Sequence, residues 1–267
     1  MALDGISFGD GRRDGLEVYS MRSTNQRIII WGGRGHAKVV HEFLPALGYQ
    51  VVAVFDNAAG IPSPLKEIPI FFGRGEFDRW LERAENVAAV TAGGLAGVVA
   101  IGGSHGGDRV SILRSMRHAG LATPTLIHPT AFVAHGNSIG FGCQILALAA
   151  VCADAVLGEG CIVNTHATVE HECELEEGVH VAPGATLTGC VTVGKHAFIG
   201  AGSVVLPRLR IGEGVIIGAG SVVTKDIPPH TVAYGNPARV VRTLDSGDSH
   251  SDPPKTFQVG GASEKTP

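Results

Sequence analysis

Residues 157–175 read Leu157-Gly-Glu-Gly-Cys-Ile-Val163-Asn-Thr-His-Ala-Thr-Val169-Glu-His-Glu-Cys-Glu-Leu175, and every sixth residue of this stretch is aliphatic. The same period runs in both directions, from Ile127 to Val223, through 17 positions without an exception. A small side chain usually follows four residues after each aliphatic one. One large and one small inward residue in every six is typical of triangular coils. Residues 127–223 are therefore predicted to form a left-handed parallel β-helix of hexapeptide repeats.

The register of this repeat separates the five cysteines into two groups. Cys143, Cys161 and Cys173 fall on the small inward position, where a thiol packs as a small hydrophobe. Cys152 and Cys190 fall elsewhere in the hexad, and the chain has no CxxC pair. We therefore expect no disulfide framework, and a cytoplasmic location.

The part of the chain before the repeat alternates strand-like and helix-like segments. Strands are predicted at residues 27–32, 51–55 and 97–102, and helices at 36–47, 76–85 and 108–119. This alternation predicts an α/β, Rossmann-like domain at 27–124, followed by the all-β β-helix domain at 125–242. The polar ends of the chain, 1–26 and 243–267, are expected to be a disordered leader and a disordered tail.

Composition excludes two classes of partner. The net charge of −4 gives no electrostatic basis for binding nucleic acid. No stretch approaches the roughly 20 apolar residues that are needed to cross a bilayer. We therefore expect neither nucleic acid nor a membrane as a partner.

A glycine-rich turn follows the first predicted strand and reads Gly32-Gly-Arg-Gly35-His36. Such a turn presents backbone N–H groups and a helix N-terminus to a phosphate. The dinucleotide fingerprint is incomplete, because Lys38 stands where its third glycine would be. Asp56, at the end of the second strand, is suited to a ribose or base contact. The turn favours a nucleotide ligand over a redox dinucleotide, although a turn needed only for packing would read the same.

The densest polar cluster of the repeat lies around His171, between Glu170 and Glu172. A histidine flanked by carboxylates is suited to act as a general base, although a solvated salt bridge has the same sequence. A zinc site is a third interpretation, since His166 lies nearby and His135 lies two coils before His171. Three histidines bind zinc between subunits in trimeric β-helices of the gamma carbonic anhydrase type.

Taken together, the motifs resemble those of the PglD/NeuD-type sugar O/N-acyltransferases over residues 27–242. The resemblance rests on Gly32-x-x-Gly35-His36, Phe55-Asp56, Ala100-Ile-Gly102, Ile127-His-Pro129, Asn164-Thr165, Glu170-His171-Glu172-Cys173 and Gly235-Asn-Pro-Ala238. Two positions depart from the family pattern, because Arg34 stands where small residues are common and Asn57 where a second acidic residue can occur. Both lie where a nucleotide would be recognised, so the resemblance does not identify the nucleotide.

The resemblance implies a role for each matching residue. His171 would be the general base supported by Glu172, Asn164 would lie near the acceptor, and the Gly189 amide would face the thioester carbonyl. Acetyl-CoA would contact His180, Ala201 and Ala219. The nucleotide sugar would contact Arg34, Gly35, His36, Asp56, Asn57 and Gly102.

The implied function is direct, acetyl-CoA-dependent N-acetylation of a nucleotide-linked amino sugar by a homotrimer that uses no metal. Three alternatives remain open from the sequence. They are O-acetylation of a sialic acid-like sugar, a zinc-dependent hydratase of the gamma carbonic anhydrase type, and a non-catalytic scaffold that binds a nucleotide sugar.

Overall fold

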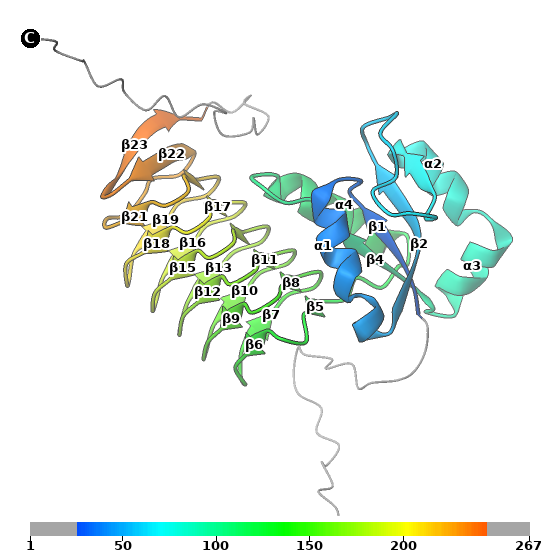
Figure 1. Ribbon diagram of the computed structural model, residues 1–267, viewed down its shortest axis with the longest axis horizontal. Coiled ribbons are helices and arrows are strands. Elements are labelled where there is room, and N and C mark those ends of the chain that lie inside the picture. The colour runs from blue at the N-terminus through cyan, green and yellow to red at the C-terminus, as the bar shows by residue number, and fades with distance from the viewer. Residues whose placement is uncertain (1–25, 245–267) are drawn as a thin grey trace, which may run out of the picture.

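The computed structural model describes residues 26–244 (Figure 1). Its N-terminal part contains a four-stranded parallel sheet. The strands lie in the order β3-β2-β1-β4. Their bounds are β1 (Gln26–Trp31), β2 (Tyr49–Asp56), β3 (Ile70–Phe72) and β4 (Leu95–Val99). Ile28, Ile29 and Ile30 of β1 have no exposed surface, because helices cover both faces of the sheet.

Four helices cover the two faces of this sheet. They are α1 (Gly35–Phe43), α2 (Gly73–Leu81), α3 (Ala84–Thr91) and α4 (Gly106–His118). Val40 and Phe43 of α1 pack on one face, whereas Phe77 of α2 and Leu113 of α4 pack on the other. The N-terminal fold class is therefore confirmed as α/β and Rossmann-like.

The structure changes three details of the predicted elements. The helix expected at 36–47 ends at Phe43 and continues as a short 3-10 helix, Pro45–Leu47, because Pro45 has no N–H to donate to the α-helix. The strand expected at 97–102 is β4, residues 95–99. The short strand β3 and the helix α3 were not predicted, since neither has a long periodic pattern.

Seventeen strands of two residues each, β5 to β21, build three flat faces of a left-handed parallel β-helix. We name one face after the α/β domain that docks on it and the other two after their outward residues. The docked face holds β5 (Leu126–Ile127), β8 (Gln144–Ile145), β11 (Ile162–Val163), β14 (His180–Val181), β17 (Phe198–Ile199) and β20 (Ile216–Ile217). The uncharged face holds β6 (Phe132–Val133), β9 (Ala150–Val151), β12 (Thr168–Val169), β15 (Thr186–Leu187), β18 (Val204–Val205) and β21 (Val222–Val223). The charged face holds β7 (Ser138–Ile139), β10 (Val156–Leu157), β13 (Glu174–Leu175), β16 (Thr192–Val193) and β19 (Arg210–Ile211).

Three edges join these faces, and each consists of one turn per coil. The glycine edge joins the charged face to the docked face and contains Gly142, Gly160 and Gly178. The alanine edge joins the docked face to the uncharged face and contains Ala147, Ala201 and Ala219. The histidine edge joins the uncharged face to the charged face and contains His135 and His171.

The aliphatic residue of each hexad points into the β-helix, as its period predicts. Val163, Val169 and Val181, for example, have no exposed surface. Complete burial of one such side chain contributes about 1.5–3 kcal/mol, so the repeated column stabilises the whole coil. Cys143, Cys161 and Cys173 are also fully buried in this core, which confirms their predicted position.

Helix α4 docks the α/β domain onto the β-helix along the glycine edge (Figure 1). Arg109 of α4 is buried and donates hydrogen bonds to the carbonyl oxygens of Gly160 at 2.7 Å, Gly178 at 2.6 Å and Ile101 at 2.8 Å. The guanidinium therefore links the helix, the end of the sheet and two coils.

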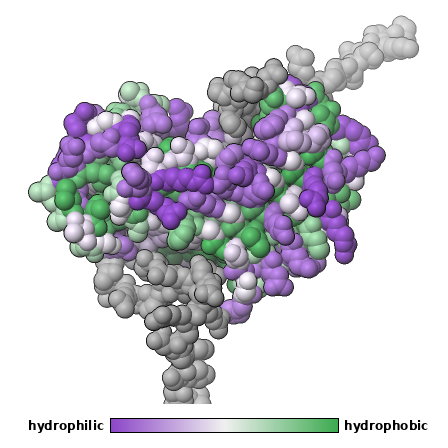
Figure 2. Space-filling view, turned by 180° about the vertical axis from the view of Figure 1, so that it is seen from behind, coloured by the Kyte–Doolittle hydropathy of each residue, from purple (hydrophilic) through white to green (hydrophobic). Residues whose placement is uncertain are grey.

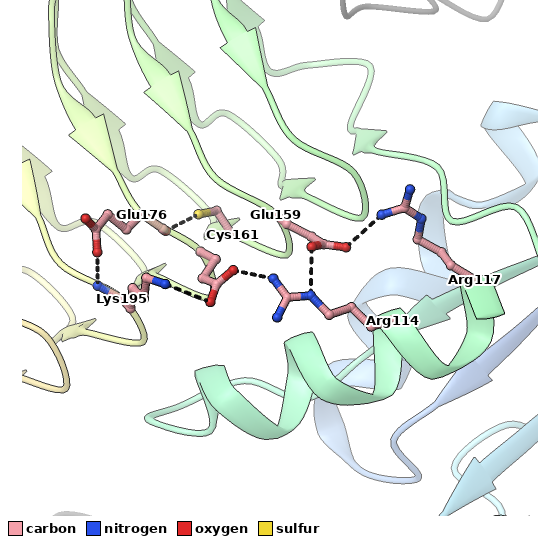
Figure 3. Close-up of polar contacts among 7 residues, drawn as sticks. Arg114, Arg117, Glu159, Cys161, Glu176 and Lys195 are labelled. Carbon is pink, nitrogen blue, oxygen red and sulfur yellow. Dashed lines mark hydrogen bonds and ion pairs between the residues drawn. The ribbon is translucent and has the colours of Figure 1, made fainter.

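Exposed ion pairs flank this contact on the same helix. Arg114 pairs with Glu159 and with Glu177, and Lys195 also pairs with Glu177. Figure 3 shows Arg114 and Arg117 on the two oxygens of Glu159. Figure 2, seen from behind the view of Figure 1, shows hydrophilic residues over much of that face, with smaller hydrophobic areas among them.

The β-helix ends at two longer strands. β22 (Thr231–Gly235) pairs parallel with β20 and antiparallel with β23 (Ala238–Thr243), after Pro228 and Pro229 interrupt the repeat. The expected leader and tail lie outside the described residues, apart from Gln26, which begins β1, and Thr243 and Leu244. Within residues 26–244, none of the helices combines the length and the hydrophobicity that crossing a membrane would need.

Candidate active site

His171 lies exposed on the histidine edge, with Glu172 beside it. The imidazole Nδ1 lies 3.0 Å from Oε2 of Glu172. This hydrogen bond, followed by a second one from Cys190, lowers the pKa of the Glu172 carboxyl, so Glu172 is ionised at neutral pH. An ionised carboxylate only accepts hydrogen bonds, so Nδ1 carries a proton, and in the neutral imidazole Nε2 keeps its lone pair. The geometry gives a base whose tautomer is fixed by its neighbour.

Gly189, one coil further along the same edge, lies directly against this imidazole. A Cβ atom at Gly189 would come within 2.5 Å of Nε2 of His171, so a side chain at this position would displace the ring. Within the described chain, no hydrogen bond has the Gly189 amide as its donor. A free N–H group and a proton acceptor therefore lie next to one another, as the chemistry of acyl transfer requires.

The glycine turn at the end of β1 is held in place by Asp56. Gly32 has a φ of +120°, and a Cβ atom there would overlap the carbonyl oxygen of Ala100. Asp56 accepts hydrogen bonds from the backbone N–H groups of Gly33, at 2.5 Å, and of Ala58, at 2.7 Å. The carboxylate predicted to bind substrate therefore also fixes the turn.

The remaining predicted substrate residues surround this turn at the carboxyl ends of the parallel strands. Arg34, Gly35 and Asn57 are exposed, and Gly102 is half-buried next to His180. A crevice at the ends of neighbouring parallel strands is the usual ligand site of open α/β sheets. The structure thus brings the predicted substrate residues together.

A chain of polar contacts connects this region to the docked face. His36 contacts Oε1 of Gln144 at 2.9 Å, and the Gln144 amide donates to the Val99 carbonyl at 2.8 Å. Gln144 is completely buried. Sequence reasoning missed Gln144 and Arg109. Gln144 could have been found as a polar residue in the outward column Leu126, Gln144, Ile162 and His180.

His180 lies in the same buried column and not on the open surface. Its Nδ1 lies 3.2 Å from the Gly103 carbonyl, and its Nε2 lies 3.1 Å from the amide of Asn164. Burial lowers the pKa of His180 to about 3 and that of His36 to about 4, so both are neutral near pH 7. The exposed fraction of His180 is only 4%. In a single chain this ring therefore offers almost no surface to acetyl-CoA.

Three of the predicted acceptor and acetyl-CoA residues lie on a different edge from His171. Asn164, Ala201 and Ala219 belong to the alanine edge, and the uncharged face separates them from His171 and Gly189. His166 also lies on the alanine edge, so one chain does not bring it to His171 and His135, and the zinc interpretation would need the alanine edge of a neighbouring chain. One chain thus holds the two halves of the predicted site apart.

Two family models match the chain. A model described as the PglD N-terminal domain matches residues 27–105, and a model of bacterial transferase hexapeptide repeats matches residues 190–225. No match is found among curated proteins.

Several solved structures are similar over most of the chain. A histidine-to-asparagine variant of perosamine N-acetyltransferase from Caulobacter crescentus, in complex with CoA and GDP-perosamine, is 34% identical. The match covers 80% of this chain and 96% of that one, with a TM-score of 0.69. The acetyltransferase domain of PglB from Neisseria gonorrhoeae is 33% identical, covering 81% and 100% of the two chains, with a TM-score of 0.69. WeeI from Acinetobacter baumannii shares the fold at 24% identity, 80% and 99% coverage and a TM-score of 0.67.

Proposed function

The chain belongs to the PglD/NeuD-type sugar acyltransferases, and on this premise we propose that it transfers an acetyl group from acetyl-CoA to the amino group of a nucleotide-linked amino sugar. The observation that carries the proposal is the contact of His171 with both Glu172 and Gly189 on an exposed edge. The perosamine enzyme supports an amine as the acceptor, because its name specifies N-acetylation.

The transfer proceeds in one ternary complex. Nε2 of His171 takes the proton of the attacking amine while the new C–N bond forms at the thioester carbonyl. Glu172 stabilises the resulting imidazolium through Nδ1. The Gly189 amide donates to the oxyanion, which typically contributes about 3 kcal/mol to transition-state stabilisation. The C–S bond then breaks, and the imidazolium returns its proton to the departing sulfur of CoA.

The complete site requires a second copy of the chain. The predicted acetyl-CoA residues lie on the alanine edge, while the base lies on the histidine edge. The uncharged face between these edges carries no charged outward residue in the described coils, and Phe132 on it is 60% exposed. Packing this face against another copy would bring the histidine edge of one chain to the alanine edge of its neighbour. We therefore propose a homotrimer with its active sites between subunits.

A groove of about 360 Å³ supports the assignment of acceptor and cofactor to the alanine edge. Its walls include Lys38 and Val39 of α1 and Ala147 and Thr165 of the alanine edge. The α/β domain and the alanine edge therefore share one concave surface.

The first test is a thermal-shift screen with GDP-, UDP- and dTDP-linked amino sugars, followed by an assay of thiol release from acetyl-CoA. We expect thiol release only with an amino sugar, and a product that is heavier by one acetyl group. The same nucleotide sugars with a hydroxyl in place of the amine are the matched control. Thiol release with the hydroxyl sugars alone would favour O-acetylation, and binding without turnover would favour a non-catalytic scaffold.

Subunit mixing tests the shared site. His171→Ala removes the base from the histidine edge. Ala201→Trp places a bulky side chain on the alanine edge, where acetyl-CoA is proposed to bind. Each variant alone should be inactive, while co-expressed chains should regain activity, because some interfaces then combine an intact histidine edge with an intact alanine edge. A mixture as inactive as its components would contradict a site between subunits.

A further inference from the structure

A thiol completes a three-residue cluster at the predicted base. Oε2 of Glu172 lies 3.0 Å from Nδ1 of His171 and 3.6 Å from Sγ of Cys190. The three donor atoms all lie within 4.8 Å of one another. Within residues 26–244, no other three His, Cys, Asp or Glu residues meet in this way.

The position of Cys190 follows from the coil geometry. It lies 18 residues after Glu172, which places both residues at the same point of successive turns. Each adopts a left-handed backbone conformation, with φ of 57° at Glu172 and 62° at Cys190. The Cys190 N–H also donates to the His171 carbonyl at 2.9 Å. The backbone therefore aims the thiol at the carboxylate, in contrast to the three cysteines that point into the core.

The three donors suit a thiophilic divalent cation. Zinc is bound at about 2.0–2.2 Å by histidine nitrogen and carboxylate oxygen and at about 2.3 Å by thiolate. Tetrahedral angles then require separations of roughly 3.3–3.6 Å between donor atoms, close to the 3.0 and 3.6 Å that separate Oε2 of Glu172 from the other two donors. Three protein ligands leave the fourth position to water, as in open zinc sites.

We propose that His171, Glu172 and Cys190 form a Zn²⁺ site that switches off acetyl transfer. This inference rests on the proposed function, in which His171 is the base. The histidine edge must be open to substrate, so a metal ion can also reach it. Zn²⁺ displaces the Cys190 thiol proton to solvent and takes the place of the His171 Nδ1 proton, and no electron is transferred.

The loss of activity follows from the tautomer of the bound imidazole. A neutral imidazole carries one proton, and a metal on Nδ1 forces that proton onto Nε2. Nε2 then has no lone pair with which to accept the proton of the attacking amine. Zn²⁺ therefore blocks the base without covering the groove that holds acetyl-CoA.

The test compares the full chain with its Cys190→Gly variant. Glycine accepts the left-handed conformation without strain, and the inhibition of each variant is measured relative to its own rate without Zn²⁺. Zn²⁺ should inhibit thiol release by the unchanged protein, and a chelator should restore it. Cys190→Gly should need at least about tenfold more Zn²⁺ for half-inhibition of its own uninhibited rate, because metal affinity falls by such factors when a site is disturbed. Cys152→Ser is the matched control, since Cys152 is a half-buried thiol on the same edge, and it should remain as sensitive as the unchanged protein.

A direct measurement separates this inference from the proposed function. Co²⁺ bound to a thiolate gives a charge-transfer band in the near ultraviolet, whether or not the protein turns over substrate. The band should appear with the unchanged protein and with Cys152→Ser, and disappear with Cys190→Gly. Absence of the band from the unchanged protein, or Zn²⁺ inhibition that persists in Cys190→Gly, would overturn the inference.

Discussion

His171 and His180 lie nine residues apart on one β-helix, yet their environments are opposite. His171 is exposed on the histidine edge and contacts a carboxylate, whereas His180 is buried on the docked face and contacts a backbone carbonyl. The hexad places both side chains on the outside of the coil. What distinguishes them is the α/β domain, which covers one and leaves the other free for chemistry.

The glycine edge, which the α/β domain covers, and the open histidine edge differ in the residues that adopt the left-handed conformation. Most turns have one residue in the left-handed conformation, and the glycine edge uses Gly142, Gly160, Gly178 and Gly214, with His196 as its exception. The histidine edge places Asp154, Glu172, Cys190 and Arg208 at the equivalent points, with Gly136 as its exception. A left-handed non-glycine residue costs on the order of 1–3 kcal/mol. The open edge thus carries backbone strain where side chains act, while the covered edge uses glycine where α4 approaches closely.

The substitution Arg109→Ala tests the contact of α4 with the glycine edge and has the largest expected effect. Two buried carbonyl groups and the half-buried one of Ile101 would lose their donor, and each unsatisfied buried group costs about 1–3 kcal/mol. We expect the free energy of unfolding to fall by at least about 3 kcal/mol, measured by urea denaturation. Arg117→Ala is the matched control on the same helix. It removes a surface ion pair with Glu159 and a cation–π contact with Phe141, so a loss of only about 1 kcal/mol is expected. Equal losses in the two variants would contradict the role of Arg109.

The buried histidines predict how stability depends on pH. The folded pKa values of His36 and His180 are lowered to about 4 and about 3, mainly by burial, while the unfolded values remain near 6.5. Below pH 6.5 the unfolded chain therefore binds more protons, and stability falls as the pH drops towards these folded values. The slope is at most about 1.4 kcal/mol per pH unit for each histidine. Urea denaturation at pH 7 and pH 5 should show this loss, and His180→Asn should reduce it. Equal stability of the unchanged protein at both values would refute this account.

Two adjacent glycines test the closeness of α4 to the glycine edge. A Cβ atom at Gly106 would overlap the Gly178 carbonyl oxygen, whereas one at Gly107 would make only ordinary contact, at 3.9 Å, with His196. Gly106→Ala should therefore destabilise the protein by about 1–3 kcal/mol. Gly107→Ala should be neutral, or stabilising by less than about 1 kcal/mol, because alanine favours the helix. A thermal unfolding series would reveal the difference, and no difference would mean that the helix tolerates a wider gap.

The repeat made the β-helix predictable, since its register alone decides which residues point inward. That register also placed His171 outside and three cysteines inside. The assignment of Gly189 depended on family resemblance, because a single glycine in a glycine-rich repeat carries no signal of its own. Its contact with Nε2 of His171 appears only in the folded coil.

Other parts of the site could not be predicted from the sequence. Asn164 and His171 are close in sequence, but the coil turns a corner between them and places them on different edges. Arg109 resembles any surface arginine of a helix, because its partners are backbone carbonyls up to 69 residues away. Contacts of a side chain with distant backbone leave no pattern in the sequence.

The rate of thiol release by His171→Ala tests the central claim most directly. At saturating acetyl-CoA and nucleotide amino sugar, kcat should fall by about two orders of magnitude or more, as expected for loss of a general base. The free energy of unfolding and the oligomeric state should stay unchanged, because the side chain is exposed and outside the core. A variant that folds and assembles normally and retains near-normal kcat would contradict the account.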